Sequence, residues 1–126
     1  MTYSFEKLDV WQKAKDFTVA VYKATSKFPK GEKFGLVSQL RRASVSVGSN
    51  IAEGSSRTSA KDQGRFYVMA YSSANEVLNQ LIISKELEYL KEETYKELRK
   101  ELEEITAMLN RLHKATGSLG VEEFSC

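Results

Sequence analysis

A basic cluster with tyrosines nearby is the part of this sequence most suited to binding chemistry. Arg57, Lys61 and Arg65 recur at steps of four, and Tyr67 and Tyr71 follow them. Cationic side chains bind phosphates, and aromatic rings stack on bases. Together with Arg41 upstream, these cations are predicted to form a nucleic-acid-binding surface. The alternative is a solvent-exposed loop whose tyrosines pack on neighbouring helices.

A polar stripe precedes this cluster in the stretch QLRRASVSVGSNIAEG, residues 39–54. At 100° per residue its polar side chains flank an apolar face, and they could meet a carboxylate from the next helix near the bundle interior. A buried carboxylate needs an arginine or hydroxyl partner, because an unpaired buried charge is costly. The predicted network consists of Arg42, Ser46, Asn50, Glu53 and Glu76.

The same stretch is rich in small residues, among them Ala43, Gly48, Ala52 and Gly54. Glycine and serine weaken an isolated helix, so their benefit is expected to be close approach by a neighbouring backbone. Tight helix packing and a functional surface both remain open as explanations.

Catalytic and metal-binding patterns are not found. His113 is the only histidine and Cys126 the only cysteine, so neither a triad nor a metal cage is expected. His113 is predicted in a solvated last helical turn, where a positive charge is favourable. The glycines Gly48, Gly54 and Gly64 lack the spacing of a phosphate-binding loop. We therefore expect a protein that is not an enzyme and that uses neither a cofactor nor a metal.

Four helices are predicted to position these residues. Leu98, Leu102, Ile105 and Leu109 alternate steps of four and three, which is typical of a bundle seam. Phe28-Pro29 ends the first helix, and Ser59 starts the third with Asp62 three residues later. Short loops between long helices favour an all-α, antiparallel, up-down-up-down four-helix bundle over residues 1–117. Its helices are expected at about 8–27, 32–55, 59–88 and 92–115, with a mobile tail over 118–126.

Charge is distributed unevenly along the 126 residues. Residues 1–75 hold 12 Lys and Arg against 6 Asp and Glu, whereas residues 76–126 hold 7 against 11. This bipolarity fits either a basic face for an anionic polymer or complementary faces for self-association. No apolar run is long enough to span a membrane, and the first ten residues lack a signal pattern. A cytoplasmic protein with no membrane partner is expected.

The chain resembles the bacterial four-helix-bundle family of 23S rRNA intervening-sequence proteins. The segments that carry the resemblance are FEKLDVWQKA, FPKGEKFGLVSQLRRASVSVGSNIAEGSSR and KDQGRFYVMAYSSANEV. The likeness extends from about Phe5 to Leu112. Its most specific part runs from Arg41-Arg42-Ala43 through Ser46 and Asn50 to Glu53-Gly54.

Three positions depart from the family pattern. Ser72-Ser73 stands where a glycine usually precedes the serine, and Ala74 stands where leucine is usual. Glu88-Tyr89 stands where glycine is common before the tyrosine. These departures are interpreted as variations in helix packing.

The resemblance implies a homo-oligomer, because related proteins form pentameric rings. A similar protein, the accessory protein of diversity-generating retroelements, works with a reverse transcriptase and binds nucleic acid. The expected function is therefore RNA or DNA binding through basic patches repeated around a ring. The alternative is a protein-interaction scaffold or accessory subunit, in which Arg41 and Arg42 serve subunit contacts.

Overall fold

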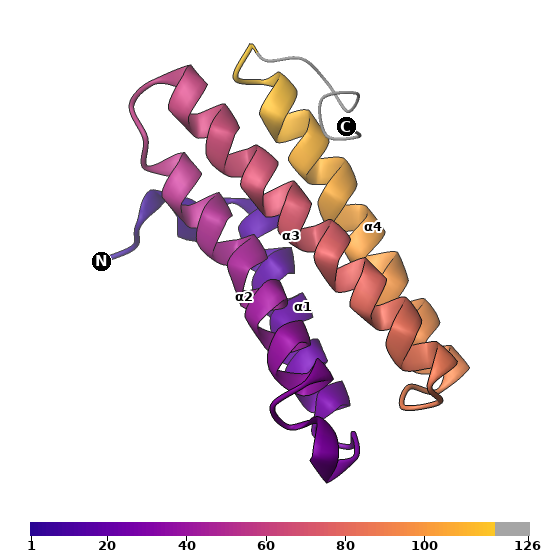
Figure 1. The fold of residues 1–126 in the computed structure, drawn as a ribbon. Coiled ribbons are helices and arrows are strands. Elements are labelled where there is room, and N and C mark those ends of the chain that lie inside the picture. The colour runs from indigo at the N-terminus through magenta and orange to yellow at the C-terminus, as the bar shows by residue number, and fades with distance from the viewer. Residues whose placement is uncertain (118–126) are drawn as a thin grey trace.

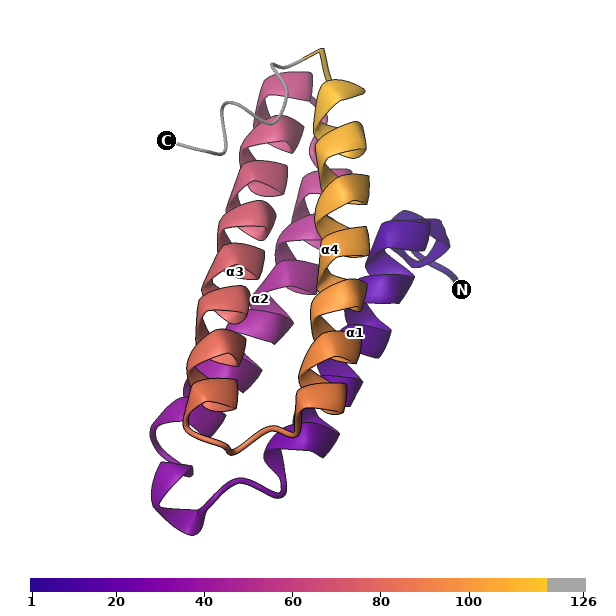
Figure 2. The same cartoon turned by 90° about the vertical axis from the view of Figure 1, so that its right-hand side faces the viewer.

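Long antiparallel helices make up the fold of this protein. The structure is a computed structural model, and it describes residues 1–117. Figures 1 and 2 show these helices lying side by side. Two short 3-10 helices, η1 and η2, precede α1 and α2. The elements are η1 Ser4–Lys7, α1 Asp9–Thr25, η2 Lys30–Glu32, α2 Leu36–Ser55, α3 Ala60–Glu86 and α4 Glu92–Lys114. The all-α four-helix bundle predicted from the sequence is confirmed.

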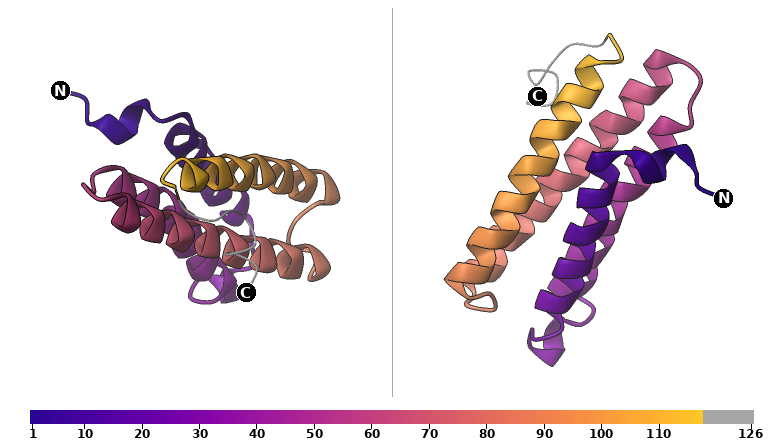
Figure 3. Two further views of the ribbon diagram at one scale, coloured as in Figure 1. Left: turned by 90° about the horizontal axis from the view of Figure 1, so that it is seen from above. Right: turned by 180° about the vertical axis from the view of Figure 1, so that it is seen from behind.

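The connections lie at two opposite ends of the bundle (Figure 2). The α1–α2 and α3–α4 connections share one end, called here the lower end, and the α2–α3 turn lies at the upper end. Each helix packs on two neighbours: α2 contacts α1 and α3, and α4 contacts α1 and α3. Figure 3 shows the arrangement from above and from behind. Short connections force consecutive helices to run antiparallel.

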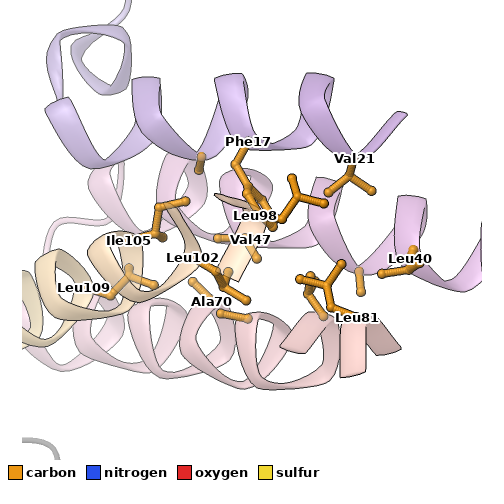
Figure 4. Packing of buried hydrophobic residues seen from close by; sticks show 14 of the residues in the cluster. Phe17, Val21, Leu40, Val47, Ala70, Leu81, Leu98, Leu102, Ile105 and Leu109 are labelled. Atoms are coloured by element: carbon orange, nitrogen blue, oxygen red, sulfur yellow. The ribbon is translucent and has the colours of Figure 1, made fainter. Parts of the chain in front are cut away.

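Aliphatic side chains from all four helices fill the centre of the bundle (Figure 4). The predicted seam of α4 is buried, and Val47 of α2 and Leu81 of α3 face it. Burying one such side chain stabilises the fold by about 1.5–3 kcal/mol. Phe17 of α1, which is almost completely buried, fills the space between them.

The α1–α2 connection differs from the prediction, because α2 begins at Leu36 and not at Glu32. Residues 30–32 form the separate turn η2 directly after Pro29. The Glu32 side chain then accepts a 3.1 Å hydrogen bond from the Leu36 backbone N–H through Oε1. A free N–H at the start of α2 is thereby satisfied by a carboxylate that lies outside the helix.

The end of α3 carries neither glycine nor proline, yet it is sharply defined. Glu88 has a positive φ of 64°, a conformation that glycine usually supplies. The Glu88 N–H donates to the Lys85 carbonyl, and the Tyr89 N–H donates to the Ser84 carbonyl, both at 2.9 Å. These two bonds form a Schellman motif, in which a left-handed residue closes a helix.

The predicted C-terminal tail, 118–126, lies outside the described residues. No helix within residues 1–117 is long and apolar enough to cross a membrane.

Candidate nucleic-acid interface

The α2–α3 turn at the upper end positions three of the four predicted cations. Ser59 caps α3, because its Oγ accepts a 3.1 Å hydrogen bond from the Asp62 N–H. This cap, which was predicted from the sequence, fixes where α3 begins. Lys61 and Arg65 therefore lie one turn apart in the first two turns of α3, and both are exposed.

Two of these cations form local ion pairs. Arg57 Nη2 lies 3.0 Å from Glu53 Oε2, and Arg65 Nη2 lies 3.0 Å from Asp62 Oδ1. The Arg57 and Arg65 side chains remain 43% and 71% exposed. Exposed pairs of this kind contribute about 0–1 kcal/mol, so an incoming phosphate can compete with the carboxylates. Lys61 has no acidic partner within residues 1–117.

One of the two predicted tyrosines, Tyr67, does not match the stacking prediction. Tyr67 is only 3% exposed, and burial raises the pKa of its hydroxyl group. Its ring packs inside the bundle and is closed to a base. Phe66 instead lies beneath Arg57, with the guanidinium carbon 4.6 Å from the ring centroid. Phe66 therefore orients the arginine.

Arg41 does not belong to this cluster. Its guanidinium lies 4.5 Å from the Tyr22 ring centroid, and its Nε donates a 3.0 Å hydrogen bond to Thr25 Oγ1. Both partners belong to α1. Sixteen residues separate Arg41 from Arg57 along the chain, a rise of about 24 Å if both lay on one helix. The grouping of Arg41 with the turn is corrected, because helical periodicity does not reveal which neighbour a flank faces.

The predicted polar network forms only in part. Asn50 Nδ2 donates to the Ser46 carbonyl at 2.9 Å and to Ser46 Oγ at 3.1 Å. Ser46 Oγ lies 2.9 Å from Ser73 Oγ of α3, so this small network joins the two helices. Ser73 was not predicted as a member.

The charged members lie outside this network. Glu53 pairs with Arg57 at the surface, and both Glu76 and Arg42 are exposed. The prediction that Asn50, Glu53 and Glu76 meet near the interior was wrong, because solvation is available to the carboxylates at the rim of the α2–α3 contact.

The small residues of α2 bring its backbone close to α3. A Cβ atom placed on Gly54 would lie 2.7 Å from Cε1 of Tyr67 and 3.0 Å from Cβ of Phe66. Ala43, Ala70 and Ala74 are buried in the same core. Close helix packing therefore explains the glycine at position 54. The exposed charged residues remain as the functional candidates.

A shallow groove runs between the exposed sides of α2 and α3, from the lower end upward. It has a volume of about 420 Å³, and its lining includes Phe34, Ser38, Gln39, Arg42, Ser46 and Glu76. Phe34 and the exposed lysines before it were not among the predicted site residues; these lysines are Lys27, Lys30 and Lys33. Their alternation with aromatics in KFPKGEKF was the available signal.

The opposite side of the bundle is acidic. A groove of about 370 Å³ between α1 and α4 is lined by Asp16, Glu97, Glu101 and Glu104, with Lys13 and Lys100. Partial burial and the neighbouring Glu104 and Glu97 raise the pKa of the Glu101 carboxyl group, while Lys13 acts against them. A polyanion is repelled by this face, so the charge asymmetry of the sequence has a counterpart in the fold.

His113 is buried and only 2% exposed, so the prediction of a solvated histidine was wrong. The last turn of α4 packs its inward face against the core. Among residues 1–117, no three or more His, Cys, Asp or Glu side chains come together in a way that could hold a metal ion.

These features define the class: an antiparallel four-helix-bundle protein with exposed cations at its α2–α3 turn. The model of the 23S rRNA-intervening sequence protein family matches residues 6–111. The chain therefore belongs to this family, as the sequence resemblance predicted.

A solved structure shows the same fold. It is the crystal structure of a protein with unknown function from the S23 ribosomal protein family of Bacteroides thetaiotaomicron VPI-5482. The two chains are 27% identical, with a TM-score of 0.75 over 83% of this chain and 98% of the other. Comparison with curated proteins gives no match.

Proposed function

We propose that this chain is a non-enzymatic, homo-oligomeric protein that binds RNA or DNA through exposed cations. The observation that carries the proposal is the cluster of Arg57, Lys61 and Arg65 at one exposed turn. The name of the family, which refers to ribosomal RNA, supports a nucleic-acid partner. A cytoplasmic location belongs to the same proposal.

Repetition of the patch gives the proposal its energetic basis. Glu53 and Asp62 offset two of the three positive charges, so one copy binds phosphates weakly. A pentameric ring, which the family resemblance implies, would present five such patches to one polymer and raise the overall affinity. Val45, Met69 and Ile83 stay exposed on α2 and α3 and are available for contacts between copies.

The first experiment measures binding of labelled structured RNA and duplex DNA by fluorescence anisotropy over a range of salt concentrations. Submicromolar binding that weakens steeply with salt is expected. The double variant Arg57→Glu/Lys61→Glu should bind at least about tenfold more weakly. A matched control, Lys96→Glu/Lys100→Glu on α4, makes the same change in net charge away from the turn. An equal loss in both variants would contradict a local site.

A protein-interaction scaffold is the second candidate, and the exposed apolar side chains of α2 and α3 favour it. In that case the chain serves as an accessory subunit of a larger protein, such as a reverse transcriptase. No binding of either nucleic acid at low salt would favour this candidate. The mass of the assembly, measured by light scattering, tests the oligomer in both cases: several times 14.3 kDa is expected, and a monomer would contradict it.

A further inference from the structure

Two phenylalanines of the α1–α2 connection have opposite environments. Phe28 is 7% exposed and packs against Tyr89, with ring centroids 5.4 Å apart. Phe34, six residues later, is 89% exposed. The first ring anchors the connection to the core, and the second is presented to solvent.

Hydrogen bonds hold the connection that carries Phe34 in place. Glu32 accepts the Leu36 N–H through Oε1 and the Tyr89 hydroxyl group through Oε2, at 3.1 Å and 3.0 Å. The Lys33 N–H donates to the Lys30 carbonyl at 3.2 Å. A ring held by such a braced segment loses little conformational entropy when a ligand stacks on it.

Exposed lysines lie in the same connection as the exposed ring. Lys27, Lys30 and Lys33 are exposed and have no acidic partner within residues 1–117. Lys33 Nζ lies 5.4 Å from the Phe34 ring centroid. Glu32, the acidic residue among them, offsets one of the three positive charges. This connection therefore keeps a net charge of +2, whereas the α2–α3 turn, where Glu53 and Asp62 oppose three cations, keeps +1.

The ring also stands at one end of the α2–α3 groove. Ser38 and Gln39 bring a hydroxyl and an amide to the lining, and Glu76 of α3 brings a carboxylate. Arg42 brings a guanidinium, which forms no ion pair with Glu76 or another acidic residue within residues 1–117. Gln39 Oε1 accepts a 3.4 Å hydrogen bond from Gln80, which steadies the amide. An aromatic ring beside polar groups and cations is suited to the flat face of a base, its polar edge and the flanking phosphates.

We propose that Phe34 and the adjoining α2–α3 groove bind an unpaired base of single-stranded nucleic acid, while Lys30, Lys33 and Arg42 contact the neighbouring phosphates. This inference rests on the proposed nucleic-acid binding and names both a second site and the class of ligand. A duplex cannot use the site in this way, because its bases are stacked on one another. An anionic membrane is less suited, since one exposed ring and a few lysines provide weak anchoring.

The test compares single strands with a duplex. Anisotropy is measured with a labelled oligouridylate, a labelled oligothymidylate and a duplex of the same length. Phe34→Ala should weaken binding of both single strands roughly tenfold, with the duplex unchanged. The control Leu87→Ala, which removes another exposed apolar side chain at the same end, should leave all three affinities unchanged. Thermal melts check that both variants fold as the parent does.

A second pair of variants tests the phosphate contacts. Lys30→Ala/Lys33→Ala should weaken binding and reduce the slope of log affinity against log salt by about 1.4 for a single strand, about 0.7 for each lost phosphate contact. Phe34→Ala should leave that slope unchanged, because a ring releases no counterions. In Phe34→Trp, single strands should quench the new indole fluorescence, with Trp11 of the parent protein as the background.

Each remaining outcome overturns a defined claim. Equal binding of Phe34→Ala and parent protein to single strands would overturn the inference and leave the proposed function standing. A change in assembly mass on Phe34→Ala would assign the ring to a contact between copies and overturn it too. The inference would also be overturned if the protein sedimented with phosphatidylserine vesicles in a Phe34-dependent way and bound no single strand. No binding of any nucleic acid by the parent at low salt would overturn both claims.

Discussion

The Tyr89 hydroxyl group donates a 3.0 Å hydrogen bond to Glu32 Oε2 and so joins the two connections at the lower end of the bundle. The other oxygen of the same carboxylate accepts the first N–H of α2. One side chain therefore sets the start of α2 and its attachment to the α3–α4 connection. It also braces the segment that presents Phe34.

This bond predicts a pH dependence at alkaline pH. The hydrogen bond to Glu32 raises the pKa of Tyr89, and burial and the negative charge of Glu32 add to the effect. Because the folded-state pKa lies above the unfolded value, the stabilisation is fully present below about pH 10 and is lost as pH rises through the folded-state pKa. Tyr89→Phe should melt at a lower temperature than the parent at pH 8, and the difference in melting temperature should decrease above pH 10.

Tyr22→Phe is the matched control for this series. Tyr22 keeps its ring under Arg41 in that variant, and its hydroxyl group makes no hydrogen bond within residues 1–117. If the difference in melting temperature between Tyr89→Phe and the parent stayed constant across the pH range, the hydrogen bond to Glu32 would not be its cause.

Glu88→Gly should stabilise the protein by about 0.5–1 kcal/mol. A left-handed conformation costs an L-residue roughly 1–2 kcal/mol, and the greater freedom of glycine in the unfolded chain offsets part of the gain. Glu88→Ala removes the same carboxylate but retains Cβ, so it should give no such gain. Urea unfolding of the three proteins measures the difference.

Two glycines of α2 should respond in opposite ways to alanine. Gly54→Ala should destabilise by about 1–3 kcal/mol, because the new methyl group would lie 2.7 Å from the buried Tyr67 ring. Gly48→Ala should stabilise by about 0.5–1 kcal/mol, since its nearest neighbours would be 3.8 Å away and alanine favours the helix. Denaturant melts check both, and a loss of stability in Gly48→Ala would contradict the reasoning.

Asn50→Ala should cost about 1 kcal/mol, the net value of a part-buried hydrogen-bonding group. Glu76→Gln should change the free energy of unfolding by less than about 0.5 kcal/mol, because its carboxylate is exposed. Thermal melts of the two variants compare a member of the Ser46–Ser73 network with a residue outside it. A large loss of stability in Glu76→Gln would contradict this expectation and support the interior network predicted from the sequence.

Glu101→Gln should stabilise the protein at pH 7 by up to about 0.5 kcal/mol. The raised pKa of Glu101 means that its carboxyl group favours folding at low pH and that this contribution is lost as pH rises through the folded-state pKa. The gain from the substitution should therefore disappear near pH 4. Glu93→Gln, in the first turn of α4, should give no gain at pH 7, because the helix N-terminus favours a negative charge there.

The sequence by itself determined the elements of this protein. Apolar spacing predicted the helices, and Pro29 and Ser59 marked two of their ends, because periodicity and capping depend on residues within one or two turns. The resemblance in its motifs placed the chain in its family. The small side chains of α2 likewise indicated a close helix contact, which Gly54 and Tyr67 make.

Only the tertiary structure decided which groups meet. It turned Arg41 toward Tyr22, placed Glu76 in solvent and buried His113. It also gave Phe28 and Phe34 opposite environments, although each directly follows a lysine in the same short connection. Each of these outcomes depends on which neighbouring helix faces a given flank, and that is fixed by packing between residues far apart in the chain, which local spacing does not encode.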